Sequence, residues 1–307
     1  MSVSVPVRRF FRRRDNKGYL FILPYFVAFL TFQLYPMIYT LILSFQTPLN
    51  MFENEFAGLA NYERLFSTAL FYQTIGNTWY IWLVNFVPQI VIALFLGVVL
   101  SDRSIRGGQT FRTLYFLPNL VTAASIGVLF AVLLDWRFGA LNQMLLRFGV
   151  VDEPINWLQA PLIAQGTVSF IQWWQWFGYT TIIIMAGLSA IGDELYEAAH
   201  IDGASTWQVF GRITLPLLRP TMLYVTVTSL IGGLQIFDIP RVLTNGRGAP
   251  DNALTTMVLY LYNQAFSYFN VGYAAAVAYV LFIMILVFSA IAFAVINTDR
   301  GAARRRA

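Results

Sequence analysis

Apolar and charged positions follow one another along the chain in long blocks rather than in a short period. Six blocks carry no charged residue, and they cover 18–52, 65–101, 113–134, 154–192, 220–237 and 252–298. A helix needs about 20 apolar residues to cross about 30 Å of hydrocarbon. Trimming the polar ends of these blocks predicts an all-α membrane protein with six transmembrane helices, over 19–44, 77–100, 113–134, 164–188, 220–239 and 271–296.

Two of these blocks leave a choice of interpretation. The last block is long enough for a seventh span, but only 257–266 of its first part is mostly apolar, so we expect a short external or interfacial helix there. The first block follows basic residues, as a signal peptide would. Its apolar run 19–45 is too long for one, and no Ala-x-Ala site follows. We therefore expect an uncleaved first span that tolerates Pro24 and Pro36.

Composition supports the membrane interpretation. Hydrophobic residues make up 58% of the chain, charged residues make up 11%, and the mean hydropathy is +0.61. A soluble domain carries about 25% charged residues, so the low charge argues against a soluble globular enzyme. Intrinsic disorder requires low hydrophobicity together with high charge, so the same values exclude it.

Rare residue types exclude several kinds of chemistry. Cysteine is absent and His200 is the only histidine, so a thiolate or multi-histidine metal site is impossible. Lys17 is the only lysine and precedes Gly18, whereas a phosphate-binding P-loop requires Gly-Lys-Ser/Thr. We therefore expect no catalytic residue, no metal and no bound cofactor. If ATP drives this protein, a partner subunit must hydrolyse it.

Basic residues predict the orientation, because cytoplasmic loops carry the excess of Lys and Arg. Of 20 basic residues, 15 fall in the two termini, the second–third loop and the fourth–fifth loop. Both termini and the loop 189–219 are therefore predicted to be cytoplasmic. The resulting domain plan has a basic tail over 1–18, a six-span domain over 19–296 and a basic tail over 297–307. The net charge of +5 suits tails that hold anionic lipid, and we expect no nucleic-acid partner.

The loop 189–219 carries the most information. Its composition predicts a helix over 193–201, and Gly203 can adopt the left-handed backbone that ends a helix. A second short helix is expected from Ser205, with Pro216 and Pro220 at the entry to the next span. From composition alone, this helix–turn–helix hairpin is equally consistent with an amphipathic connector that rests on lipid headgroups.

The spacing of seven residues in this loop resembles the signature loop of ABC importer permeases. The pattern is Glu-Ala-Ala, three residues, Gly, nine residues, Ile, one residue and Leu-Pro, and it is filled by Glu197, Ala198, Ala199, Gly203, Ile213, Leu215 and Pro216. The segments 58–62 and 111–118 outside the loop, and 197–205 within it, are similar to carbohydrate permeases of the maltose, lactose and glycerol-3-phosphate type. The segment 245–250 departs from that group, which often has Gly-Gly-Pro there.

The resemblance implies a type I ABC importer permease in a prokaryotic inner membrane. It implies a second permease subunit, with a heterodimer favoured, two ATPase subunits that bind ATP and Mg²⁺, and an external solute-binding protein. The loop would couple the permease to an ATPase through Glu197, Ala198, Ala199, Asp202, Gly203, Ile213 and Pro216. Glu197 is expected to pair with a basic ATPase residue, and Asp202 either to cap the second helix or to contact the partner. The alternative for Glu197 is a solvated helix charge.

Polar residues inside the predicted spans are candidates for substrate binding, because a polar group in lipid is costly unless it is buried or functional. Gln172, Trp176 and Tyr179 fall at i, i+4 and i+7 on the fourth span, where an amide and two aromatic rings suit a sugar. The other candidates are Ser229, Gly233 and Gln235 near the fifth span and Ser125 in the third. The alternative is helix packing, since small residues allow close approach of helices.

Three functions are alternatives to that of a sugar importer subunit, and the sequence disfavours each of them. A gradient-driven transporter usually needs ionisable groups in its spans, and the six blocks offer none; Asp238 lies at the end of the fifth span. A membrane enzyme needs clustered His, Asp or Glu. An amino-acid or metal importer is disfavoured by the sugar-type segments. The sequence leaves open which sugar or polyol derivative is carried.

Overall fold

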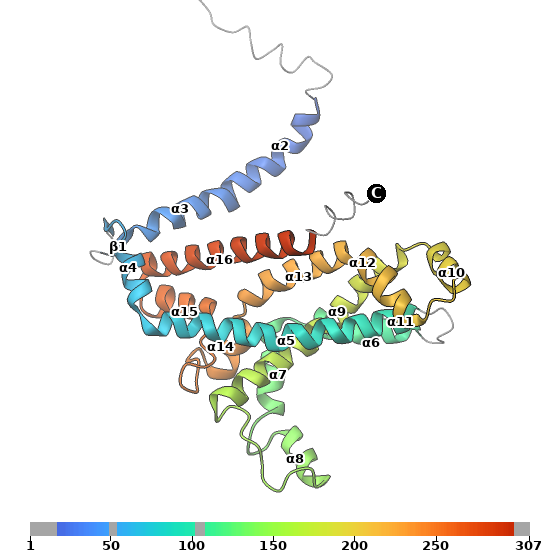
Figure 1. The fold of residues 1–307 in the computed structure, drawn as a ribbon. Coiled ribbons are helices and arrows are strands. Elements are labelled where there is room, and N and C mark those ends of the chain that lie inside the picture. Colours follow the sequence, from blue (N-terminus) through green and yellow to red (C-terminus); the bar gives the residue numbers. More distant parts are fainter. Residues whose placement is uncertain (1–16, 49–53, 102–107, 298–307) are drawn as a thin grey trace, which may run out of the picture. The chain divides into compact units, whose positions relative to one another are not determined.

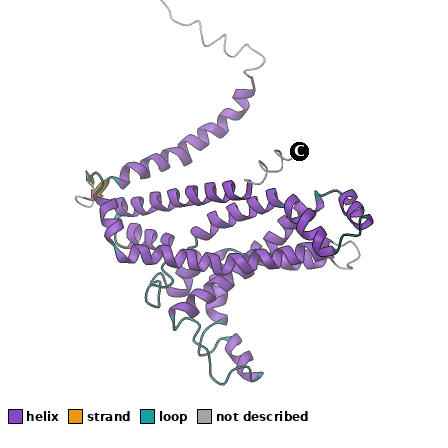
Figure 2. Ribbon diagram, viewed as in Figure 1, coloured by secondary structure: helices purple, strands orange, loops and turns teal. Residues whose placement is uncertain are grey.

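The computed structural model describes residues 17–48, 54–101 and 108–297. Helices make up most of this described chain (Figure 2). Most of the two predicted basic tails, and the positions Arg103 and Arg106 that enter the orientation argument, lie outside the described residues.

The chain forms two compact units, and helix α16 (Val271–Asn297) contributes to both. The first unit takes in Met1–Leu65 and Gln264–Tyr279, and the second takes in Phe66–Asn263 and Val280–Ala307. Figure 1 gives the order of the elements along the chain.

The first unit contains the predicted first span. It comprises α2 (Lys17–Phe29), the π-helix η2 (Leu30–Leu34) and α3 (Tyr35–Ser44), which follow one another without a break. The π segment ends just before Pro36, which has no N–H to donate within the helix. The Tyr279 hydroxyl of α16 donates to the Met37 carbonyl oxygen at 2.6 Å, so α16 is tied to α3 within this unit.

A short hairpin that the sequence did not predict follows the first span. Strands β1 (Gln46–Pro48) and β2 (Asn54–Phe56) pair antiparallel with Gln46 opposite Phe56. The next helix, α4 (Ala60–Ser67), supplies the anchor: Asn61 Nδ2 donates to the carbonyl oxygens of Ser44 at 3.0 Å and of Gln46 at 2.8 Å. A buried amide therefore satisfies the carbonyl groups where α3 ends and β1 begins.

The second unit is organised around two long helices, α5 (Ala69–Ser101) and α9 (Pro161–Ser189), which pack along much of their length. The remaining elements of this unit are the helices α6 (Gly108–Leu120), α7 (Ala123–Leu133), α8 (Ala140–Arg147), α10 (Asp193–Ile201), α11 (Thr206–Val209), η3 (Phe210–Thr214), α12 (Leu215–Leu217), α13 (Arg219–Leu234), α14 (Asp238–Thr244) and α15 (Met257–Tyr262). The last π-helix, η4 (Asn263–Ser267), lies at the boundary between the units.

The core of the second unit is apolar and lies where α5, α7, α9 and α14 meet. Its fully buried members include Ile81, Ile126, Ile171 and Ile239. The χ1 angle of a β-branched side chain is already restricted in a helix, so packing it into a helix interface costs little further rotamer freedom. Such side chains fill the interface densely. The core thus fixes α9 against α5 before any polar contact is considered.

Polar contacts then join α5 and α9 to the segment before α15. Asn77 Nδ2 donates to the carbonyl oxygens of Asn252 at 2.7 Å and Thr255 at 3.1 Å. Gln165 Nε2 of α9 donates to Asn77 Oδ1 at 2.9 Å. The Thr78 hydroxyl accepts from the Met257 N–H at 2.9 Å. We call this arrangement the Asn77 clasp, and it places a loop without regular structure against two long helices.

Two predicted spans are not continuous helices. The span predicted over 113–134 is split into α6 and α7, which are bent by 94°. Pro118 lacks the N–H that would continue α6, and Thr122 caps α7 by accepting from the Ser125 N–H at 3.3 Å. The span predicted over 220–239 ends as a helix at Leu234, and α14 begins as a separate helix at Asp238.

Four described helical segments are long and apolar enough to cross a membrane, namely Phe21–Ser44, Ala69–Ser101, Arg219–Thr244 and Val271–Ile296. The bent pair α6–α7 makes up to five if it counts as one span. Helix α9 has 29 residues but is not among them, because its amide, hydroxyl and indole side chains lower its hydropathy. The short helix predicted within 257–266 is confirmed as α15.

The Asn77 clasp generates the first prediction. Replacing Asn77 by Ala removes both bonds to the loop and leaves Gln165 without its Asn77 partner, which should destabilise the protein by about 1–3 kcal/mol. Thermal unfolding of the detergent-purified protein would measure the change.

The matched control is Gln73→Ala. Gln73 donates to the Asp251 carbonyl oxygen of the same loop at 2.8 Å, but this bond is exposed and should contribute little. Equal melting temperatures for Asn77→Ala and the unmodified protein would contradict the role given to the clasp.

Candidate functional site

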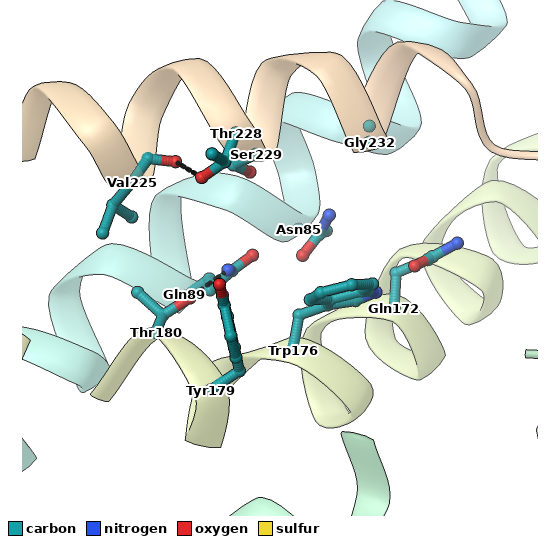
Figure 3. A pocket seen from close by; sticks show the side chains of 11 residues that line it. Asn85, Gln89, Gln172, Trp176, Tyr179, Thr180, Val225, Thr228, Ser229 and Gly232 are labelled. Atoms are coloured by element: carbon teal, nitrogen blue, oxygen red, sulfur yellow. Dashed lines mark hydrogen bonds between the residues drawn. The ribbon is translucent and has the colours of Figure 1, made fainter. Parts of the chain in front are cut away.

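A cavity of about 200 Å³ lies within the second unit, between α5, α9 and α13 (Figure 3). We call it the polar cavity, because most of its lining side chains are amides, hydroxyls or aromatic rings. The lining residues are Asn85, Gln89, Gln172, Trp176, Tyr179, Thr180, Val225, Thr228, Ser229, Gly232 and Gly233. None of these residues is charged.

Helix α9 contributes the three residues that its sequence spacing placed on one face. Gln172, Trp176 and Tyr179 all line the polar cavity, since a step of three to four residues returns to the same side of a helix. Gln172 is 8% exposed, whereas Trp176 is 40% exposed. The Tyr179 hydroxyl lies 3.4 Å from that of Tyr224. This face therefore presents one buried amide beside two accessible rings.

Helix α13 contributes two more predicted residues, Ser229 and Gly233, and both contact Trp82 of α5. Trp82 Nε1 donates to the Ser229 hydroxyl oxygen at 3.2 Å. A Cβ atom at Gly233 would overlap the Trp82 indole. Gly233 thus allows α13 to approach α5 closely, so the packing interpretation applies to it even though it lines the polar cavity.

Two predicted residues do not reach the polar cavity. Gln235 lies past the end of α13 and is exposed. Ser125 lies in the first turn of α7, where its hydroxyl accepts from the Thr122 hydroxyl at 2.9 Å. Neither is among the lining residues. Ser125 belongs to α7, which contributes no lining residue, and Gln235 follows the last residue of α13.

The structure adds lining residues that the sequence analysis missed, and the most polar are Asn85 and Gln89 on α5. They stand four residues apart in the mostly apolar stretch 79–100 of this helix, so the cost of polar groups in lipid could have identified them. Gln89 Nε2 donates to the Thr180 hydroxyl at 2.6 Å. Asn85 is 5% exposed, and its Oδ1 has no hydrogen-bond partner among the described residues.

Metal chemistry finds no support at this site. The described residues contain no group of three or more His, Asp or Glu side chains that could hold a metal ion. The polar cavity offers instead hydrogen-bonding groups and aromatic rings around an uncharged space. Such a lining can hold a neutral polar molecule by hydrogen bonds and ring contacts.

The second candidate site is the hairpin between α9 and α13, built as the sequence predicted. Helix α10 ends in a Schellman motif: the Gly203 N–H donates to the His200 carbonyl oxygen at 3.1 Å, and the Ala204 N–H to that of Ala199 at 2.9 Å. Gly203 has φ +74°, a conformation that disfavours any side chain. Helix α11 follows at once.

The prediction that Asp202 caps the second helix is wrong. Ser205 caps α11 in a capping box with Gln208, whose Oε1 accepts from the Ser205 N–H at 2.8 Å. Asp202 is instead the C-cap residue that follows α10 and precedes Gly203. Two residues, Gly203 and Ala204, separate Asp202 from Ser205, so the turn through Gly203 carries Asp202 away from the start of α11.

The hairpin exposes both charge and large apolar side chains. Glu197 and Ala198 are exposed and Ala199 is buried, while Ile213 and Pro216 are partly buried. Ile201 is 86% exposed and Trp207 is 81% exposed. Large apolar residues at the tip of a hairpin are typical of a surface that another protein covers.

Comparison with known proteins now decides the family. The model of the binding-protein-dependent transport system inner membrane component family matches residues 76–300. The chain belongs to this family. It is therefore a multi-pass permease component of an ABC transporter in the inner membrane, as its Glu-Ala-Ala loop predicted.

Individual relatives agree with this assignment. The permease is 36% identical to the lactose transport system permease protein LacF of Rhizobium radiobacter, over 92% of this chain and 94% of that protein. It is 34% identical to the arabinooligosaccharides transport system permease protein AraP of Bacillus subtilis, over 96% and 93% of the two chains. A crystal structure of a bacterial alginate ABC transporter shares the fold with a TM-score of 0.77 at 24% identity, over 91% of this chain and 93% of that one.

The contact between Gly233 and Trp82 generates the second prediction. A Gly233→Ala permease must shift α13 away from α5 or displace the Trp82 indole, which should destabilise it by about 1–3 kcal/mol. Gly232→Ala is the control, because nothing lies within 4 Å of a Cβ atom there and the position also lines the polar cavity. Thermal unfolding of both purified variants checks this; similar midpoints would refute the packing role of Gly233.

Proposed function

We propose that this permease forms half of the translocation pathway for a sugar or sugar derivative, with the polar cavity as its substrate site. The main support for the proposal is the set of side chains that line the cavity. Gln172, Trp176 and Tyr179 of α9 face the same space as the amides of α5 and the hydroxyls of α13. Amides hydrogen-bond sugar hydroxyls, and aromatic rings contact the apolar faces of sugar rings. The names of the relatives, a lactose permease and an arabinooligosaccharide permease, support this substrate class.

The proposed topology has six spans with both termini in the cytoplasm. Helix α9 supplies the sixth span beyond the five apolar candidates, since its polar residues face the cavity or other helices rather than lipid. The distribution of 15 of 20 basic residues on one side supports the orientation. This arrangement matches the predicted six-span domain over 19–296 and puts the hairpin on the cytoplasmic side.

The hairpin is proposed to couple the permease to a separate ATPase. Glu197 would pair with a basic ATPase residue, and the exposed Ile201 and Trp207 would be covered by the same partner. A rigid hairpin joined to α9 and α13 can transmit ATPase closure as a rigid-body movement. ATP and Mg²⁺ would bind the ATPase, and an external binding protein and a second permease would complete the complex.

Copurification followed by transport tests this function. The tagged permease, expressed from its native context and extracted in mild detergent, should bring with it an ATPase and a second permease. Vesicles containing this complex and its binding protein should take up a neutral oligosaccharide only when ATP is supplied. A permease recovered alone that still transports without ATP would instead identify a gradient-driven carrier.

The coupling role predicts the effect of Gly203→Ala. An alanine at φ +74° costs about 1–2 kcal/mol, so the Schellman turn should distort and ATP hydrolysis should no longer drive uptake. The ratio of sugar transported to ATP hydrolysed in vesicles measures this. Gly211→Ala is the control, because its φ is ordinary and a Cβ atom there meets nothing within 4 Å. Normal transport by well-expressed Gly203→Ala permease would disprove the coupling role of this turn.

A further inference from the structure

We infer that Asn85 is a specificity-determining residue of the polar cavity, and that its amide bonds a hydroxyl group of an uncharged saccharide. The inference rests on the proposed function and adds to it the residue of α5 that selects the substrate and the reason why that substrate is uncharged. It begins from one atom. Asn85 Oδ1 is buried and accepts no hydrogen bond from the described residues, although its side chain lines a cavity.

Most polar groups of the cavity wall are already satisfied by the protein. Gln89 donates to Thr180 at 2.6 Å, Ser229 accepts from Trp82 at 3.2 Å, and Thr228 donates to the Tyr224 carbonyl oxygen at 2.8 Å. The bonds of Gln89 and Ser229 join α5 to α9 and to α13, and the bond of Thr228 lies within α13. They reduce the number of lining groups that remain to bond a ligand.

Asn85 is different because its burial is not compensated. A buried amide oxygen without a partner destabilises the fold by about as much as a lost hydrogen bond. Such groups in folded proteins usually accept a hydrogen bond from water or from a ligand. Figure 3 shows the Asn85 amide directed into the space between α9 and α13, near Trp176. A molecule in the cavity would therefore lie beside this amide.

The chemistry of the wall selects the kind of molecule. Asn85 Oδ1 is a hydrogen-bond acceptor, so the matching ligand group is a donor such as a hydroxyl. All eleven lining side chains are uncharged. A carboxylate or phosphate moved from water into this wall would lose its hydration and gain no cation in return. The cavity therefore favours a neutral saccharide over a uronate or a sugar phosphate.

Helix α9 provides a closely matched control. Gln175 is 4% exposed and its Oε1 also lacks a partner among the described residues, but it does not line the cavity. Its Nε2 instead donates to the Val121 carbonyl oxygen at 3.4 Å, beside the α6–α7 bend. Gln175→Leu thus removes an uncompensated buried amide oxygen away from the proposed site.

The experiment measures ATP-driven uptake by the complete complex in vesicles with its binding protein. Lactose, arabinotriose, maltotriose and trehalose serve as neutral probes, and digalacturonate serves as the acidic probe.

Asn85→Leu should reduce uptake of the accepted neutral probe about tenfold at low sugar concentration, which is the effect of one net hydrogen bond. Gln175→Leu should stay within twofold. Asn85→Ser, which keeps an acceptor oxygen, should retain more uptake than Asn85→Leu. Digalacturonate should enter at least tenfold more slowly than the neutral probe.

Each result has a defined meaning. Uptake by Asn85→Leu within twofold of the unmodified complex overturns the inference, as does an equal loss in Gln175→Leu or equal uptake of digalacturonate. If the Asn85→Leu complex fails to assemble on size exclusion, the Asn85→Ser and Asn85→Ala complexes are compared instead. Equal uptake by these two complexes overturns the role of the acceptor oxygen. An unmodified complex that takes up none of the sugars overturns the proposed function, and the inference fails with it.

Discussion

The pairing of α5 with α9 is the interaction on which the second unit depends. An apolar core of isoleucines presses the two helices together, and polar bonds join them at three levels: Gln165 to Asn77, Ser169 to the Ile81 carbonyl oxygen at 3.2 Å, and Gln89 to Thr180. Between helices in a membrane each such bond contributes about 0.6 kcal/mol on average. Their main effect is to fix the register of the pair. The cavity, the clasp and the bent α6–α7 segment are all built against this pair.

Glycines at two helix contacts explain how polar side chains can line a cavity inside an apolar unit. Gly178 lets the backbone of α6 approach α9 on one side, since a Cβ atom there would overlap the Tyr115 carbonyl group. Gly233 does the same for α13 against Trp82. With both neighbours drawn in, the face of α9 that carries Gln172 and Tyr179 is left facing α5 and α13 across a small space. Small residues thus define where the cavity lies, and larger polar residues define its chemistry.

Much of this arrangement was predictable from the sequence. Charge-free blocks located the long helices, and the Gly203 turn and the helix from Ser205 followed from local backbone preferences. The three cavity residues of α9 followed from helical periodicity. Two candidates do not line the cavity, because Ser125 lies on α7 beyond the α6–α7 bend and Gln235 follows the end of α13. Asn85 carries the signal of a polar side chain in an apolar stretch, but only tertiary packing shows that it faces the same space as Gln172 and Tyr179 of α9.

The three walls of the cavity are tethered unequally. Helix α9 is bonded to α5 at three levels, whereas among the described residues the bond of Ser229 with Trp82 joins α13 to α5. Both α9 and α13 continue into the hairpin that bears Glu197. A displacement of that hairpin would therefore act on α9, which is bonded to α5 at three levels, and on α13, which is bonded to α5 through Ser229. A displacement of the hairpin that moved α13 relative to α5 and α9 would change the width of the cavity while the α5–α9 pair kept its register.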